Sequence, residues 1–141
     1  MVSEEGVLEI ASESDIVTAR TTIRNVVSNV GFGLTDTTRI VTAVSELARN
    51  IYLYAEVGTM RWRVRSEGSR RVVEIVFDDD GPGISDVDRA LEEGYSTSSG
   101  MGHGLSGAQK MMDEFEIDTS AETGTTVTIR KYVPQVVAND G

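Results

Sequence analysis

Three short stretches of the chain contain residues whose types and spacing could do chemistry. In SELARN, Glu46 and Asn50 lie four residues apart, so on a helix they would share one side. An asparagine side-chain oxygen suits Mg²⁺, and a glutamate can act as a base toward a hydroxyl or a water. Taken alone, the pair favours the solvated polar face of an ordinary helix.

The second stretch is VFDDDGPGIS, in which a β-branched run ends in three aspartates. An aspartate at a strand end can accept a hydrogen bond from a ligand amine, and Gly81 and Gly83 would leave space for a flat ring. Aspartate, glycine and proline are also the commonest turn formers. This stretch by itself therefore favours an acidic turn.

The third stretch is rich in glycine and precedes a predicted helix: Gly100, Gly102, Gly104 and Gly107. Glycines at a helix N-terminus let backbone N–H groups approach an anion, and the helix dipole favours negative charge there. GHGLSG also fits the G-x-G-x-x-G spelling of a dinucleotide-binding turn, but no strand runs directly into Gly102 and the surrounding elements do not alternate as a βαβ unit requires. Phosphate binding is the functional interpretation, and a flexible loop is the alternative.

Composition limits the possible functions further. The chain has 141 residues and a net charge of −10, which disfavours nucleic acid and membrane surfaces as partners. It contains no cysteine, and His103 is its only histidine, which excludes disulfides and sites built from several histidines. The N-terminus has no signal-peptide pattern, so we expect a cytoplasmic protein.

Hydrophobic periodicity predicts the elements that must position the three stretches. We expect strands over 5–12, 60–67, 70–80 and on both sides of 121–124, with helices over about 14–30, 35–56 and 105–115, a short helix after 85, and a loop over 94–104. Ser14 or Asp15 should cap the first helix, and Thr35 or Asp36 the second. The order predicts an α+β two-layer sandwich, with helices on one face of a mixed, mostly antiparallel sheet. Residues 1–133 should form a single domain, with 134–141 as a frayed tail.

In this order the three stretches resemble the GHKL, or Bergerat-fold, ATP-binding module. E-x-x-x-N is on a helix, D-x-G-x-G begins at Asp79, G-x-G-x-G begins at Gly100, and GTT at 124–126 is similar to the threonine element that follows. The resemblance covers almost the whole chain. The chain is small, and in this it resembles the branch of the family that contains anti-sigma factors and the switch kinases of the stressosome.

The resemblance implies a role for each matching residue. Glu46 would be the general base, Asn50 would ligate Mg²⁺, and Asp79 would bind the adenine amino group with Thr125 assisting through water. Gly81 and Gly83 would admit the ring, and residues 94–99 would form a lid. The phosphates would be held by backbone N–H groups of Gly100, Met101, Gly102, His103, Gly104 and Leu105.

The same resemblance implies a serine/threonine-protein kinase that uses Mg-ATP. Its partners would be STAS-domain antagonist and scaffold proteins of a stressosome, and on release it would activate a serine phosphatase; a homodimer is compatible with this. The alternative is a nucleotide-gated sequestering protein of the anti-sigma type, and a third possibility is an ATPase with no protein acceptor. Tyr54 stands where related kinases often carry histidine, and Ser98 and Ser99 where they often carry a lid arginine. Arg49 either contacts a partner or is simply solvated.

Overall fold

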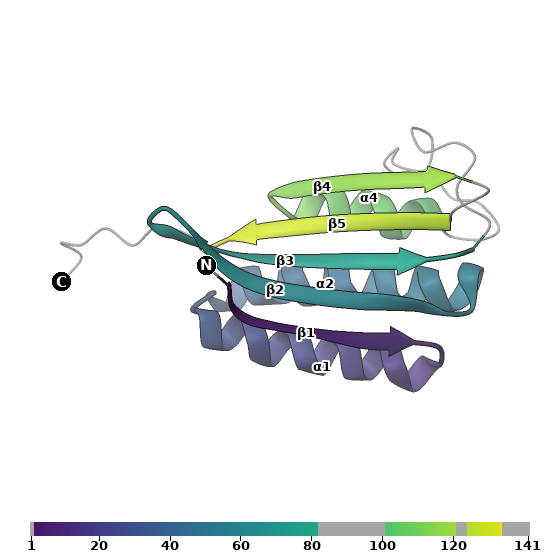
Figure 1. Cartoon of the computed structure of the whole chain (residues 1–141), viewed down its shortest axis with the longest axis horizontal. Helices are drawn as coiled ribbons and strands as arrows, with labels where there is room; N and C mark the ends of the chain where they lie inside the picture. Colours follow the sequence, from purple (N-terminus) through teal and green to yellow (C-terminus); the bar gives the residue numbers. More distant parts are fainter. Residues whose placement is uncertain (1, 82–100, 121–123, 134–141) are drawn as a thin grey trace.

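The computed structural model describes residues 2–81, 101–120 and 124–133 (Figure 1). Its elements are β1 (Val2–Ile10), α1 (Glu13–Val30), α2 (Leu34–Asn50), the π-helix η1 (Ile51–Ala55), β2 (Gly58–Glu67), β3 (Arg70–Asp79), α4 (Met101–Met111), β4 (Glu114–Ser120) and β5 (Gly124–Tyr132). The tail over 134–141 and the short helix expected after 85 lie outside the described residues.

One five-stranded sheet forms the first layer of the molecule. Its strand order is β1-β2-β3-β5-β4, and each of the four strand pairs is antiparallel. The three described α-helices lie on a single face of this sheet (Figure 1). The predicted two-layer α+β architecture is confirmed, and all the pairing among the described strands is antiparallel.

The N-terminus of α1 differs slightly from the prediction. Ser12 caps it, rather than Ser14 or Asp15, because the Ser12 hydroxyl accepts the N–H of Asp15 at 3.3 Å. The Asp15 carboxylate in return accepts the N–H of Ala11 at 2.9 Å. The first bond satisfies one of the N–H groups that the first turn of a helix leaves without an internal partner, and the second holds the residue that precedes the cap. The helix ends at Gly31, whose φ of 114° is the left-handed conformation expected of a C-terminal glycine.

Helix α2 carries the apolar stripe that the periodicity predicts. Ile40, Val44 and Leu47 are buried at 0%, 0% and 2% exposure, and they pack in the core between the helices and the sheet. Gly33 caps the helix, not Thr35 or Asp36, and no side chain bonds to the cap. The regular α-helix ends at Asn50, although the sequence predicts one helix as far as residue 56. No described helix combines the length and apolar character that crossing a bilayer requires.

Strand β2 of the β2–β3 hairpin alternates more buried with more exposed side chains, whereas β3, in the middle of the sheet, is buried continuously from Val72 to Ile75. Gly68, with a φ of 61°, makes the predicted turn between Glu67 and Arg70. Met60 and Val64 point into the helix-covered core, while Arg61 and Arg63 alternate with them and therefore lie on the opposite face. Among the described residues, the sheet thus has one face buried under helices and one open face without a helix.

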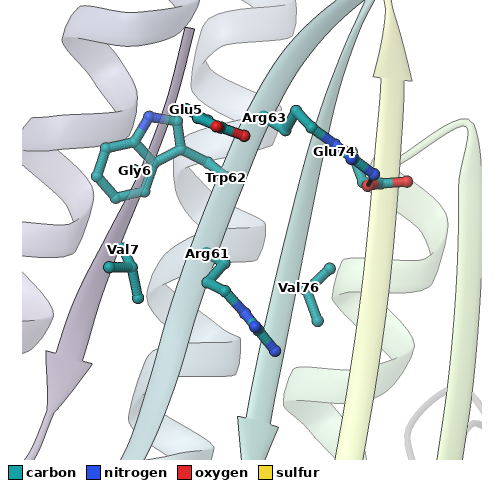
Figure 2. Close-up of a pocket in the computed structure, with 8 residues that line it drawn as sticks. All are labelled: Glu5, Gly6, Val7, Arg61, Trp62, Arg63, Glu74 and Val76. Carbon is teal, nitrogen blue, oxygen red and sulfur yellow. Dashed lines mark hydrogen bonds and ion pairs between the residues drawn. The ribbon is translucent and has the colours of Figure 1, made fainter. Parts of the chain in front are cut away.

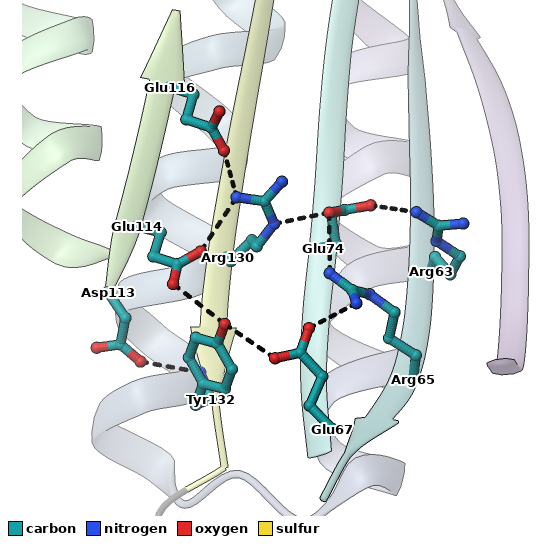
Figure 3. A network of polar contacts seen from close by, with 9 residues as sticks. All are labelled: Arg63, Arg65, Glu67, Glu74, Asp113, Glu114, Glu116, Arg130 and Tyr132. Atoms are coloured by element: carbon teal, nitrogen blue, oxygen red, sulfur yellow. Dashed lines mark hydrogen bonds and ion pairs between the residues drawn. The ribbon is translucent and has the colours of Figure 1, made fainter. Parts of the chain in front are cut away.

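An ionic network covers part of this open face (Figure 3). Glu74 lies at its centre with a side chain only 8% exposed, and it accepts hydrogen bonds from Arg63 and Arg130, both at 2.7 Å. Arg65 approaches the same carboxylate at 3.4 Å. Burial alone would raise the pKa of Glu74, but the bonds from Arg63 and Arg130 outweigh it and lower the pKa below its usual value. The network links β2, β3 and β5.

Removing the charge of Glu74 should therefore destabilise the fold. We expect Glu74→Gln to lower the free energy of unfolding by about 2 kcal/mol at neutral pH, because it leaves arginines without their shared carboxylate. Since folding lowers the pKa of Glu74, its stabilisation is present above the ordinary pKa of a glutamate and is lost as the pH falls through the lowered value. Urea unfolding across this pH range measures both effects. Glu116→Gln is the control, because Glu116 is 63% exposed; equal losses in both variants would contradict the account.

Candidate nucleotide site

The C-terminal end of α2 places Glu46 and Asn50 on one side of the helix, as their spacing predicts. The Glu46 side chain is 35% exposed and lies 3.7 Å from a guanidinium nitrogen of Arg49. The amide nitrogen Nδ2 of Asn50 is buried and has no hydrogen-bond partner among the described residues. A buried amide left unpaired costs free energy, and a ligand, an ion or a water at the site is one way in which native structures complete such a group.

The end of β3 forms the second part of the site. The Asp79 carboxylate accepts the N–H of Gly81 at 2.8 Å and a backbone hydrogen bond from Thr125, its partner across the β3–β5 ladder. The Thr125 hydroxyl, in turn, lies 2.8 Å from that of Thr119. The sequence thus correctly associates Asp79 with Gly81 and Thr125, three residues drawn from two distant segments.

Two glycines let the chain fold this tightly around Asp79. A Cβ on Gly124 would overlap the carbonyl oxygen of Asp79, and its φ of 86° is unfavourable for any other residue. A Cβ on Gly81 would lie 2.7 Å from the Cβ of Ala55. The second contact joins the Asp79 turn to η1, the segment that directly follows Asn50. The structure therefore brings the second motif against the element that continues the first.

Burial raises the pKa of Asp79 above its usual value, and the charges of Asp78 and Asp80 add to this. The backbone bonds from Gly81 and Thr125 only partly offset the increase. A carboxylate in such surroundings retains acceptor capacity in a place where water solvates it poorly. It is suited to bind a donor such as the amino group of a purine.

Helix α4 begins at Met101, earlier than the sequence predicts. Gly102, His103 and Gly104 therefore form the first turn of a helix instead of the end of a loop. The first four N–H groups of a helix have no internal partner, so these residues supply the donors that an anion needs. Leu105 and Ala108 are buried and anchor α4 in the core. Gly83, Gly100 and the expected lid over 94–99 lie outside the described residues.

Sequence periodicity misses the π-helix η1 and the turn that ends it. π-Helical turns are rare and frequently occur at functional sites. At Glu56, φ is 69° and ψ is −45°, and the N–H of Val57 bonds to the carbonyl of Ala55 at 2.8 Å. This is a γ-turn with positive φ, which is strained for a residue with a side chain. Gly58, which follows, packs its backbone against Ile51.

We expect Glu56→Gly to stabilise the protein. Glycine adopts positive φ without a steric penalty, so the strain relieved exceeds the added entropy of the unfolded chain, with a net gain of about 1 kcal/mol. The midpoint of urea unfolding, at constant slope, measures the gain. Glu9→Gly in the extended strand β1 is the matched control and should destabilise. A loss of stability in Glu56→Gly would show that the turn is not strained.

A shallow groove of about 470 Å³ lies on the open face of the sheet (Figure 2). Its lining is formed by Glu5, Gly6, Val7, Arg61, Trp62, Arg63, Glu74 and Val76. None of the described residues expected to bind nucleotide contributes to it, and α2 lies on the other side of the sheet (Figure 1). The described residues expected to bind nucleotide lie instead at the ends of α2 and β3 and at the starts of α4 and β5.

Comparison with known proteins agrees with this geometry. The model of the histidine kinase-like ATPase domain matches residues 10–131, so the chain belongs to that family. The crystal structure of the RsbU and RsbW domains of Rv1364c from Mycobacterium tuberculosis has the same fold, with a TM-score of 0.61 at 18% identity. That match covers 97% of this chain and 35% of the other.

Within the family, the relationship to one group of kinases is stronger. The chain is 42% identical to the serine/threonine-protein kinase RsbT of Bacillus subtilis, over 94% of this chain and 99% of that protein. It is 30% identical to the anti-sigma F factor of the same species, over 82% of each chain. The chain is accordingly a serine/threonine-protein kinase of the RsbT type.

Proposed function

We propose that this kinase transfers the γ-phosphoryl group of ATP to a serine or threonine of a STAS-domain protein. The acceptors would be antagonist and scaffold proteins of a stressosome-type, partner-switching pathway in the cytoplasm. Once released from these partners, the kinase would activate a serine phosphatase. The 42% identity to RsbT over nearly the whole chain supports this pathway over others.

Nucleotide recognition is assigned to Asp79 and its surroundings. The Asp79 carboxylate would accept a hydrogen bond from the adenine amino group, with Thr125 assisting through water. Gly81 and Gly83 would leave room for the ring. Backbone N–H groups at the start of α4, from Gly100 to Leu105, would bind the phosphates. The raised pKa of Asp79 supports this role, because a poorly solvated carboxylate gains most from a new donor.

Catalysis is assigned to the end of α2. Glu46 would accept the proton of the acceptor hydroxyl while the oxygen of that hydroxyl attacks the γ-phosphorus. The bond between the γ-phosphorus and the bridging oxygen to the β-phosphate then breaks, and ADP leaves. Asn50 would hold Mg²⁺, for which its side-chain oxygen is a suitable ligand, while its buried Nδ2 could donate to a phosphate oxygen. When bound, Mg²⁺ neutralises charge on the phosphates. The buried amide of Asn50, which has no partner among the described residues, is the single observation that carries the proposal.

Transfer of label from ATP tests the function. Purified kinase is mixed with γ-labelled ATP, Mg²⁺ and a STAS-domain protein of the same organism, and label is followed on protein and as free phosphate. We expect label on serine or threonine of the STAS protein. Absence of label under conditions where the two proteins bind would contradict the proposal that this kinase phosphorylates the STAS protein.

The sequestering function is the second candidate, because the chain is also 30% identical to an anti-sigma F factor. A sequestering protein would hold its partner in a nucleotide-dependent complex without modifying it. An intact glutamate at position 46 favours the kinase, since sequestration needs no base. The labelling experiment separates the two, because only the kinase leaves phosphate on the partner.

A further inference from the structure

The surface around the proposed base carries exposed apolar side chains. Leu53 and Val57 are 53% and 51% exposed, and they belong to the segment that directly follows Asn50. Single exposed apolar side chains are ordinary on soluble proteins, but a cluster of them indicates contact with another molecule. The strained γ-turn at Glu56 lies between them. Observed backbone strain of this kind is common where function requires a particular surface.

An exposed positive charge precedes the two apolar residues in the same part of the chain. Arg49 is 52% exposed and stands one helical turn before Leu53. Its ionic partner among the described residues is Glu46 at 3.7 Å, a long and solvated contact that contributes little to stability. Because the chain has a net charge of −10, it repels an acidic partner overall. An exposed arginine is the kind of group that can still pair with a carboxylate of such a partner.

We propose that Arg49, Leu53 and Val57 form the docking surface for the protein that accepts the phosphoryl group. This inference rests on the proposed function, because a hydroxyl that reaches Glu46 must belong to a protein lying over this end of α2. The occupant would present an apolar side chain against Leu53 and Val57, and a carboxylate to Arg49. By drawing Arg49 away from Glu46, that carboxylate would also leave the base free to take the proton.

Charge-introducing variants test the surface. We expect Leu53→Glu and Val57→Glu to raise the KM for the STAS acceptor by about 10-fold or more, while ATP affinity stays unchanged. Leu34→Glu and Val17→Glu are matched controls, because Leu34 and Val17 are 84% and 54% exposed elsewhere on the helices. Leu34 begins α2, about 24 Å from Asn50 at 1.5 Å per residue. Both controls should behave as the wild type.

Arg49 has an equally close control within α2. Arg39 is 54% exposed and pairs with Asp36 at 3.5 Å with the same three-residue spacing. Arg49→Gln should raise the KM for the acceptor, whereas Arg39→Gln should not. Wild-type KM values in Leu53→Glu and Arg49→Gln, with phosphate still reaching the acceptor, would overturn the docking surface alone. If the wild type neither binds nor labels the STAS protein, the proposed function fails and this surface fails with it.

Discussion

Glu46→Gln should lower the rate of phosphoryl transfer by about 100- to 10,000-fold, the range that a general base contributes. The substitution keeps the size of the side chain and its place on α2 but removes its ability to accept a proton. Affinity for ATP should stay close to that of the wild type, because adenine recognition is assigned to β3 and α4. Single-turnover transfer and equilibrium nucleotide binding measure the two quantities separately.

Glu13→Gln on α1 is the matched control for this substitution. Glu13 is an exposed glutamate near the start of the first helix, so its loss should change neither quantity. The assignment of Glu46 as base is wrong if Glu46→Gln transfers phosphate at the wild-type rate. A parallel loss of ATP affinity would instead show that Glu46 binds the nucleotide.

Asp79→Asn should weaken ATP binding by about 10- to 100-fold, which corresponds to the loss of one hydrogen bond to a charged group. The same substitution should leave the fold intact or stabilise it at neutral pH. Burial raises the pKa of Asp79, so folding favours its protonated form, and the ionised carboxylate costs stability once the pH exceeds that raised value. Asparagine removes this cost and keeps an oxygen for the N–H of Gly81.

The pH dependence of Asp79→Asn identifies the cause of its stability change. Any advantage over the wild type at neutral pH should shrink as the pH is lowered through the raised pKa of Asp79. Asp78→Asn makes the same chemical change one residue away, on the open face, where Asp78 accepts the hydroxyl of Thr126 at 2.8 Å. It should leave ATP affinity unchanged. Equal ATP affinities for Asp79→Asn and the wild type would rule out the adenine contact.

Features with local causes could be predicted from the sequence. The hairpin at Gly68 follows from turn residues between two β-branched runs, and the buried stripe of α2 follows from its helical period. The pairing of Glu46 with Asn50 on one helix side has the same origin. The turn that joins Asp79 to Gly81 is predictable for the same reason, because Asp79 ends β3 and Gly81 follows it by two residues.

Features with long-range causes could not be predicted in this way. Beyond Asn50 the regular helix is replaced by η1, in which Ile51 packs against Gly58 and Ala55 against Gly81. These contacts are made with residues outside the helix, so the periodicity of the helix sequence does not reveal them. Strand β5 lies between β3 and β4, so Glu74 meets Arg130 from a distant part of the chain. The start of α4 at Met101 has a different reason: glycines lower helix propensity, and the buried Leu105 and Ala108 anchor the helix nonetheless.

The stoichiometry of the reaction tests the central claim most directly. ADP formed from ATP is compared with phosphate on the STAS-domain acceptor, measured by intact mass in the same reaction. A kinase of the proposed kind should form one ADP for each phosphoserine or phosphothreonine, and almost none with Glu46→Gln. Release of free phosphate without modification of the acceptor, or a stable nucleotide-dependent complex with neither product, would contradict the account.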